Sequence, residues 1–310
     1  MSRILVLGGG GFLGTPVTAR LREVPGATVL HGGRVAGGAP AGRRRAPDLP
    51  VDLGTVPVDV LAGDLAALGP DVVVNCAGLV AGPASALAAV NARGAAALCE
   101  AMAAAVPAAR LVQLGSAAEY GPGVPGTALS ESATARPAGL YGATKLAGSY
   151  AVTGSGLDAV VLRVFNPVGA GSPRSGLPGR LAAAFRGSPP GGRVMTGDLG
   201  AYRDFVDVTD VAEAVARAAT AVGPLPAVVN VGSGRATLVR DLAAELAGLC
   251  GFTGELVESG SGSERSGAVS WVRADISLAA AALGWQPIRT LHDALAALWH
   301  ASAPTAGAPA

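Results

Sequence analysis

Apolar and polar positions along the first half of the chain predict strands that alternate with helices. Residues 3–7 are a short continuous apolar run, as in buried parallel strands, and residues 11–23 have helical spacing that ends at Pro25. By the same criteria we expect further strands at residues 27–31, 49–53, 71–76, 110–114 and 159–164, and helices at residues 58–68, 84–106 and 140–153. This alternation predicts an α/β fold with a doubly wound parallel sheet that is covered by helices on both faces.

After Phe165 the pattern becomes irregular. Pro and Gly are dense as far as Gly192, a strand is expected again at residues 228–231, and residues 238–299 contain two or three helical stretches. We therefore expect a sheet domain of residues 1–165 plus about 202–232, and a smaller, discontinuous C-terminal substrate lobe of about 166–201 plus 233–310. The lobe would lie over the carboxyl ends of the strands, where α/β sheets bind their ligands.

Composition favours a cytoplasmic protein with neither a nucleic-acid nor a membrane partner. The formal net charge is +1 at pH 7, so no overall field attracts nucleic acid. Cys76, Cys99 and Cys250 have no metal-site or disulfide spacing, which predicts reduced thiols. The apolar start is too short for a signal peptide, and Gly or Pro interrupts every apolar stretch before the roughly 18 residues of a spanning helix.

Three glycines stand between the first expected strand and the first expected helix. Gly8, Gly11 and Gly14 form a G-x-x-G-x-x-G run, with Phe12 and Leu13 inside it. A backbone without β-carbons can turn tightly and approach a pyrophosphate closely, and the amino terminus of the helix offers free N–H groups to the phosphates. In this strand–turn–helix context we expect all five residues to bind a dinucleotide; a plain tight turn is the alternative.

The end of the second expected strand favours NADP(H) over NAD(H). An acid there would bind the ribose hydroxyls of NAD, but the sequence reads His-Gly-Gly-Arg and places Arg34 at this point. Arg34, together with one of the arginines at positions 43–45, could bind the 2′-phosphate of NADP. The same arginines could instead form a solvated loop, and NAD(H) stays possible.

Other expected cofactor contacts follow the third and fourth strands. Asp52 and Leu53 end the third strand and could contact adenine. We prefer them to the similar Asp-Leu pair at positions 64–65, which lies inside an expected helix. Ala77 and Gly78 follow the fourth strand, and their small size leaves room for the cofactor to pass.

Tyr141 and Lys145 begin an expected helix four residues apart, so phenol and ammonium share one face. A free phenol has a pKa of about 10, and a neighbouring cation favours the phenolate, which suits proton exchange with a carbonyl or an alcohol. Ser116 follows the fifth strand, where its hydroxyl could bind the reacting oxygen. We predict that all three are catalytic and that Tyr141 and Lys145 also bind the cofactor. Taken separately, Tyr141 and Lys145 could be ordinary residues of a helix surface, and Ser116 could be an ordinary turn residue.

Several motifs, in one order, resemble the extended short-chain dehydrogenase/reductase family, also described as NAD-dependent epimerases and dehydratases. They are the glycine run GGGGFLG, LGSAAEYG at 114–121, the Tyr-x-x-x-Lys pair, LRVFNPVG at 162–169, RDFVDVTDV at 203–211, NVGSG at 230–234 and DISLAAAALGWQP at 275–287. The resemblance implies a Rossmann fold, a cofactor contact at Val168 and an oxidoreductase activity. It leaves the substrate open, because fold does not fix function.

Within that family, residues 197–205 and the Ala-Glu-Tyr-Gly at 118–121 look most like GDP-4-keto-6-deoxymannose reductases. This resemblance implies that Asn166, Arg203 and Arg265 hold a nucleotide diphosphate sugar, with both arginines near its pyrophosphate. Arg203 could instead pair with a neighbouring Asp as scaffold. Sugar dehydratases of the family carry an Asp-Glu pair directly after the catalytic hydroxyl residue, where this chain has two alanines, so we do not expect dehydration.

The leading hypothesis is an enzyme that reduces a ketone, as in a 4-keto nucleotide sugar, with NADPH and with Tyr141 as general acid. Three alternatives remain: an epimerase that retains its nicotinamide cofactor, a ketoreductase acting on a polyketide or other secondary metabolite, and a non-catalytic NADP-binding sensor. Small apolar residues surround the helix expected at 84–106, which with the helix at 140–153 predicts a homodimer.

Overall fold

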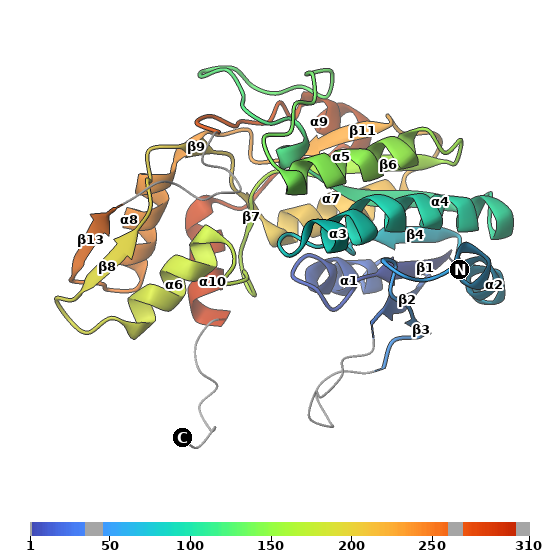
Figure 1. Cartoon of the computed structure of the whole chain (residues 1–310), viewed down its shortest axis with the longest axis horizontal. Coiled ribbons are helices and arrows are strands. Elements are labelled where there is room, and N and C mark those ends of the chain that lie inside the picture. Colours follow the sequence, from blue (N-terminus) through green and yellow to red (C-terminus); the bar gives the residue numbers. More distant parts are fainter. Residues whose placement is uncertain (1, 35–45, 260–268, 302–310) are drawn as a thin grey trace.

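The computed structural model describes residues 2–34, 46–259 and 269–301. Its centre is a seven-stranded sheet in the order β11-β6-β5-β4-β1-β2-β3, with every neighbouring pair parallel (Figure 1). These strands are β1 (Ser2–Leu7), β2 (Ala27–Gly33), β3 (Leu49–Pro50), β4 (Val72–Asn75), β5 (Arg110–Ser116), β6 (Ala159–Val164) and β11 (Val228–Val231). The winding direction reverses between β1 and β4, so the expected doubly wound fold is confirmed and its switch point lies between these two strands.

Helices cover both faces of the sheet. One layer consists of α1 (Gly14–Arg22), α7 (Val208–Thr220) and α9 (Ser277–Leu283), and the other of α2 (Val58–Leu68), α3 (Ala84–Leu87), α4 (Gly94–Ala105) and α5 (Leu140–Thr153). Successive side chains of β1 point to opposite layers: Ile4 and Val6 pack with α1 and α7, and Leu5 and Leu7 pack with α2 and α4. Because both faces are buried, the strands read as continuous apolar runs in the sequence.

A smaller lobe lies beside the sheet (Figure 1). It contains the helices α6 (Leu177–Gly187), α8 (Val239–Leu249) and α10 (Leu291–Ala301), and the parallel strand pair β8 (Arg193–Thr196) and β13 (Glu255–Glu258). Its core includes Leu181 and Phe185 of α6, Leu242 and Leu246 of α8, and Leu295 of α10. Two distant stretches of chain therefore share one core.

Two short strand pairs lie where the chain passes between sheet and lobe. They are β7 (Pro167–Val168) with β10 (Val206–Asp207), and β9 (Tyr202–Arg203) with β12 (Thr237–Leu238). Between β9 and β10, the Asp204 side chain has no exposed surface. It accepts hydrogen bonds from Ser233 N (2.6 Å) and Oγ (2.7 Å), from Gly234 N (3.0 Å) and from Ala274 N (2.9 Å). Asp204 thus fixes the loop after β11 and the segment before α9 to the lobe connection.

Several elements differ from the expectations. Helix α1 begins at Gly14 and not at residue 11, because the intervening residues form the glycine turn. Strand β3 is only Leu49–Pro50, and the helix expected at 84–106 has a π-helical segment, Ala88–Arg93, between α3 and α4. Helices α6 and α7 were not predicted at all.

Over the described ranges, no helix combines the length and the apolar character that crossing a bilayer requires.

Candidate active site

The turn between β1 and α1 leaves no room for side chains at its glycines. Gly8 has φ +72°, and a β-carbon there would lie 2.8 Å from the backbone of Ala77, in the loop after β4. A β-carbon on Gly14 would lie 2.1 Å from the Gly8 carbonyl oxygen, to which Gly11 N donates a hydrogen bond of 2.9 Å. The backbone therefore turns tightly at the switch point and leads into the amino terminus of α1, an arrangement that fits the pyrophosphate of a dinucleotide.

Phe12 and Leu13, inside this turn, are both half-buried. Leu13 packs against the core cluster under α1. Phe12 extends toward the loop after β7, where a β-carbon on Gly171 would lie 3.9 Å from its ring. Phe12 thus lies between the glycine turn and the loop that leads into the lobe.

Beside the glycine turn lies His31, in the last half of β2, whose ring is so close to Gly9 that a β-carbon there would be 2.5 Å from its Cδ2. Arg34 follows β2 and is exposed; positions 43–45 lie outside the described residues. Asp52 caps a turn by accepting a hydrogen bond from the backbone N–H two residues later (2.9 Å), and Leu53 is buried in the core. The Asp52 carboxylate, which we expected to contact adenine, thus already accepts a hydrogen bond within its own turn.

Helix α5 lies against its neighbours through two glycines. A β-carbon on Gly142 would lie 2.3 Å from the carbonyl oxygen of Ala118, and one on Gly148 would lie 2.2 Å from the carbonyl oxygen of Asn91. Only glycine permits this approach. The two glycines therefore set the position of the amino-terminal turns of α5, where Tyr141 is half-buried.

Lys145 lies beneath the switch point. It is 6% exposed, and its Nζ donates a hydrogen bond of 2.5 Å to the carbonyl oxygen of Leu114 on β5. A β-carbon on Gly78, in the loop after β4, would lie 4.0 Å from the same Nζ. Buried Asn91 holds that loop through hydrogen bonds with both backbone groups of Leu79 (2.8 and 2.9 Å).

Ser116 ends β5 and caps a short 3-10 helix, Ala117–Glu119. Its Oγ accepts a hydrogen bond from Ala118 N (3.2 Å), and its own N–H donates to a carboxylate oxygen of Glu119 (2.8 Å). Sequence reasoning assigned no role to Glu119, although Ser-x-x-Glu is the signature of such a capping box. Ser116 and the Leu114 carbonyl that binds Lys145 are two residues apart at the same end of β5.

Burial and the neighbouring negative charges shift the pKa of Lys145 in opposite directions. Burial lowers the pKa of Lys145, while the carboxylate of Glu119 and, less strongly, the thiolate form of Cys76 raise it. Burial also raises the pKa of the Cys76 thiol to about 12, so Cys76 is neutral near neutral pH. Glu119 is therefore the main negative charge that supports a protonated Lys145.

Of the residues expected to hold the substrate, the structure describes Asn166 and Arg203, and both bind backbone carbonyl oxygens. Asn166 donates a hydrogen bond from Nδ2 to the carbonyl oxygen of Asp204 (2.9 Å). The Arg203 side chain is 9% exposed, and its guanidinium donates to the carbonyl oxygens of Tyr202 (2.8 Å) and Val269 (2.6 Å). Burial lowers the pKa of Arg203.

Two further residues that we expected to bind ligand are not placed in an open site: one is buried, and the other lies outside the described residues. Val168 is 1% exposed and packs in the core of the lobe, which leaves its backbone as the part that could face a cofactor. Arg265 lies outside the described residues. The structure thus brings Ser116 and Lys145 together, with Tyr141 on the same helix as Lys145. The diphosphate site expected at Arg203 stays a prediction.

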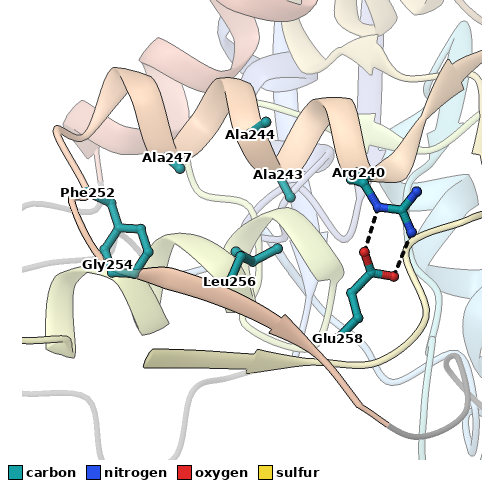
Figure 2. Close-up of a pocket in the computed structure, with 8 residues that line it drawn as sticks. All are labelled: Arg240, Ala243, Ala244, Ala247, Phe252, Gly254, Leu256 and Glu258. Atoms are coloured by element: carbon teal, nitrogen blue, oxygen red, sulfur yellow. Dashed lines mark hydrogen bonds and ion pairs between the residues drawn. The ribbon is translucent and has the colours of Figure 1, made fainter. Parts of the chain in front are cut away.

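A pocket of about 250 Å³ lies elsewhere, between α8 and β13 of the lobe (Figure 2). Its walls are mostly apolar, and Arg240 and Glu258 close one end with two hydrogen bonds (2.6 and 2.9 Å). None of the expected site residues lines it. It is smaller than the roughly 300–1,000 Å³ typical of ligand sites, and we assign it no function.

Comparison with known proteins agrees with this geometry. The NAD dependent epimerase/dehydratase family matches residues 4–232. The chain is 38% identical, over 98% of its own length and 98% of the relative's, to a dTDP-6-deoxy-L-talose 4-dehydrogenase (NAD(P)(+)) from Kitasatospora kifunensis.

Solved structures of nucleotide-cofactor complexes share the fold of this chain. RMD from Pseudomonas aeruginosa, complexed with NADPH, is 26% identical with a TM-score of 0.80, over 97% of this chain and 98% of that one. MoeE5, in complex with UDP-glucuronic acid and NAD, is also 26% identical with a TM-score of 0.80, over 96% and 98% of the two chains. With its glycine turn at the switch point and its Ser, Tyr and Lys at the carboxyl end of the sheet, the chain belongs to the NAD-dependent epimerase/dehydratase family, as an NAD(P)-dependent oxidoreductase of the extended short-chain dehydrogenase/reductase type.

Proposed function

We propose that the protein interconverts a 4-keto group and a 4-hydroxyl group on a nucleoside diphosphate 6-deoxy sugar, with NADP(H) preferred to NAD(H). The observation that carries this proposal is the position of Lys145. Its ammonium lies beside Gly78 at the switch point, one helical turn from Tyr141, on the edge of the sheet where Ser116 ends β5.

Each residue has a distinct task in this reaction. Tyr141 gives a proton to the carbonyl oxygen during reduction and takes one from the alcohol in the reverse direction. Ser116 Oγ accepts a hydrogen bond from Ala118, so its own hydrogen is available to donate to the same carbonyl oxygen. Lys145 favours the phenolate form of Tyr141 and offers its remaining donors to the nicotinamide ribose. When bound, the nicotinamide cofactor supplies or accepts the hydride.

Two observations favour a 4-keto sugar as the substrate. The relative that matches along the whole chain is named for oxidation at C4 of a dTDP-6-deoxy sugar, which in reverse is reduction of a 4-ketone. Positions 117 and 118 are alanines, so no acid lies directly after Ser116 to catalyse elimination. The nucleotide is the open choice, because the motifs resemble GDP-sugar reductases and that relative is named for a dTDP sugar.

The test is an assay of NADPH consumption with dTDP- and GDP-linked 4-keto-6-deoxyhexoses, and with NADH in parallel. We expect NADPH to be oxidised with at least one sugar, and we expect the product to be two hydrogens heavier by mass spectrometry. Binding of NADPH without oxidation by either sugar would contradict the proposal and favour a sensor. Turnover by protein that carries its own nicotinamide, without net consumption, would instead identify an epimerase, the second activity that the family description includes.

A further inference from the structure

Glu119 is a carboxylate with no exposed surface, placed directly beside the proposed catalytic residues. One of its oxygens accepts the hydrogen bond from Ser116 N (2.8 Å), and the other accepts one from Nε of Arg163 on β6 (2.8 Å). The Arg163 guanidinium also stacks on the ring of Tyr120, 4.4 Å from its centroid. The loop after β5 is therefore bound to the next strand by a buried ion pair.

The fold makes room for this carboxylate. A β-carbon on Gly115 would lie 2.9 Å from a carboxylate oxygen of Glu119 and 2.7 Å from a methyl group of Val161. A buried ion pair gives little or no net stability compared with well-packed apolar residues, because both charges lose their water. A contribution to the active site is therefore a better explanation for Glu119 than stability of the fold.

We propose that Glu119 is a positioning residue with two effects on the active site. Its carboxylate fixes the backbone at Ser116, and it places a buried negative charge at the end of β5 where the ammonium of Lys145 is bonded to the Leu114 carbonyl. The catalytic meaning of these effects rests on the function proposed above, but the contacts themselves do not.

The surroundings of Lys145 support the second effect. Cys76, which follows β4, is neutral near neutral pH, and Tyr141 and the exposed Tyr150 are the other titratable groups on Lys145's own helix. Arg93, on the π-helical segment packed against α5, donates to carbonyl oxygens of residues 53 and 56. Arg163 lies on the far side of Glu119, to which it is bonded. Among the described residues that face Lys145, Glu119 is the carboxylate that raises its pKa.

Two substitutions separate the two effects. Glu119→Gln keeps an oxygen that can accept from Ser116 N but removes the charge, so we expect the pKa of Lys145 to fall. Glu119→Asp keeps the charge but is one methylene shorter, so we expect it not to hold Ser116 N and Arg163 at the same time. For this variant we expect the pKa of Lys145 to stay near the wild-type value and kcat to fall by about tenfold or more, because small displacements at a reacting centre are costly.

The sequence offers a direct measurement of the first effect, because Lys145 is its only lysine. Protein labelled with ¹³C-lysine gives one lysine Cε resonance, and its pH titration reports Lys145 without substrate or cofactor. We expect the midpoint in Glu119→Gln to lie at lower pH than in the wild type. Glu119→Gln/Arg163→Gln removes both buried charges, leaves no unpaired one, and should move the midpoint the same way if the single variant does not fold.

A matched control lies at the other end of the same two strands. Arg110, at the start of β5, pairs with Asp158, just before β6, at 2.8 Å. Asp158→Asn breaks that ion pair far from the site, so it should leave the Lys145 midpoint unchanged even if it lowers the melting temperature.

An unchanged Lys145 midpoint in folded Glu119→Gln or in the folded double variant overturns the electrostatic effect. Wild-type kcat in Glu119→Asp overturns the positioning of Ser116. If no keto sugar is reduced by the wild type, the proposed function fails while the titration still decides whether Glu119 controls Lys145. If the sugar is reduced but the midpoint does not move, the function stands and the inference about the charge is wrong.

Discussion

Tyr141 and Lys145 share one helix but have different surroundings. Lys145 is buried and bonded to a strand carbonyl, whereas Tyr141 is only half-buried at the first turn of α5. A second tyrosine, Tyr150, lies on the same helix with 64% of its surface exposed. This difference in environment permits a matched test of which phenol carries the chemistry.

Removing the Tyr141 hydroxyl should abolish most turnover without weakening cofactor binding. In Tyr141→Phe we expect kcat to fall by about 10²–10⁴-fold, the usual contribution of general acid catalysis, with the NADPH dissociation constant unchanged. Steady-state kinetics and NADPH fluorescence titration measure the two quantities. Tyr150→Phe is the control and should retain wild-type kcat; a loss in Tyr150→Phe, or full activity in Tyr141→Phe, would assign the proton transfer to another group.

The proposed preference for NADP(H) can be tested at Arg34. Its guanidinium is exposed just after β2, so we expect Arg34→Ala to weaken NADPH binding by about 10- to 100-fold, as the loss of a hydrogen bond to a charged group predicts, and to leave NADH binding nearly unchanged. Arg22→Ala, at the exposed end of α1, is the control for general charge. Equal losses for both cofactors would show that Arg34 does not contact the 2′-phosphate.

At the scale of elements, the site depends on how closely α5 approaches the loop after β5 and the π-helical segment. Gly148 faces the carbonyl oxygen of Asn91, and Asn91 holds the loop after β4. A shift of α5 would therefore move Tyr141, Lys145 and the loop after β4 together.

Substitution of two helical glycines should have opposite results. Gly148→Ala places a methyl group 2.2 Å from a backbone oxygen, so we expect a lower melting temperature and reduced turnover. Gly63→Ala, in the exposed interior of α2 with nothing within 4 Å, should stabilise the protein by about 0.5–1 kcal/mol with unchanged kcat. Calorimetry measures both changes, and tolerance of alanine at Gly148 would contradict the close packing of α5.

Elements with a strong local pattern could be predicted from the sequence to the residue. Helices α2 and α5 and strands β6 and β11 have the expected bounds. Helix α6 was missed because it lies in a Pro- and Gly-rich stretch. Helix α7 was missed although Val208, Val211 and Val215 recur with helical spacing, so the signal that could have found it was present in the sequence. The π-helical turns depend on hydrogen bonding that leaves no compositional signal.

The site was predictable where its residues follow strands. Ser116 ends β5 and Gly78 follows β4, and parallel strands end at one edge of the sheet, so their placement on the same edge followed from the element order. Glu119 was missed because its Ser-x-x-Glu spacing indicates only a capping box, whereas its burial beside Arg163 depends on the fold. Arg203 could not be judged from the sequence, because its bonds to backbone carbonyls depend on the path of the lobe.

At the scale of the whole molecule, α5 exposes two large apolar side chains. Leu140 and Tyr150 are 48% and 64% exposed, and we propose that α4 and α5 pair with the same helices of another chain. Light scattering should then give twice the 30.1 kDa of one chain, and Tyr150→Glu should reduce it to a single mass. Val222→Glu, at a fully exposed position beyond α7, should not. A monomeric wild type would exclude this assembly.

The core of the lobe is shared by α6 from the middle of the chain and by α8 and α10 from its last third, with the return to the sheet between them. A protease that cuts once between β8 and β9 would therefore produce two fragments that remain held together by Phe185, Leu242 and Leu295. Such nicked protein should migrate as one particle in gel filtration and separate only in denaturant. Expression of the tail as an isolated fragment, by contrast, would leave half of that apolar interior without a partner.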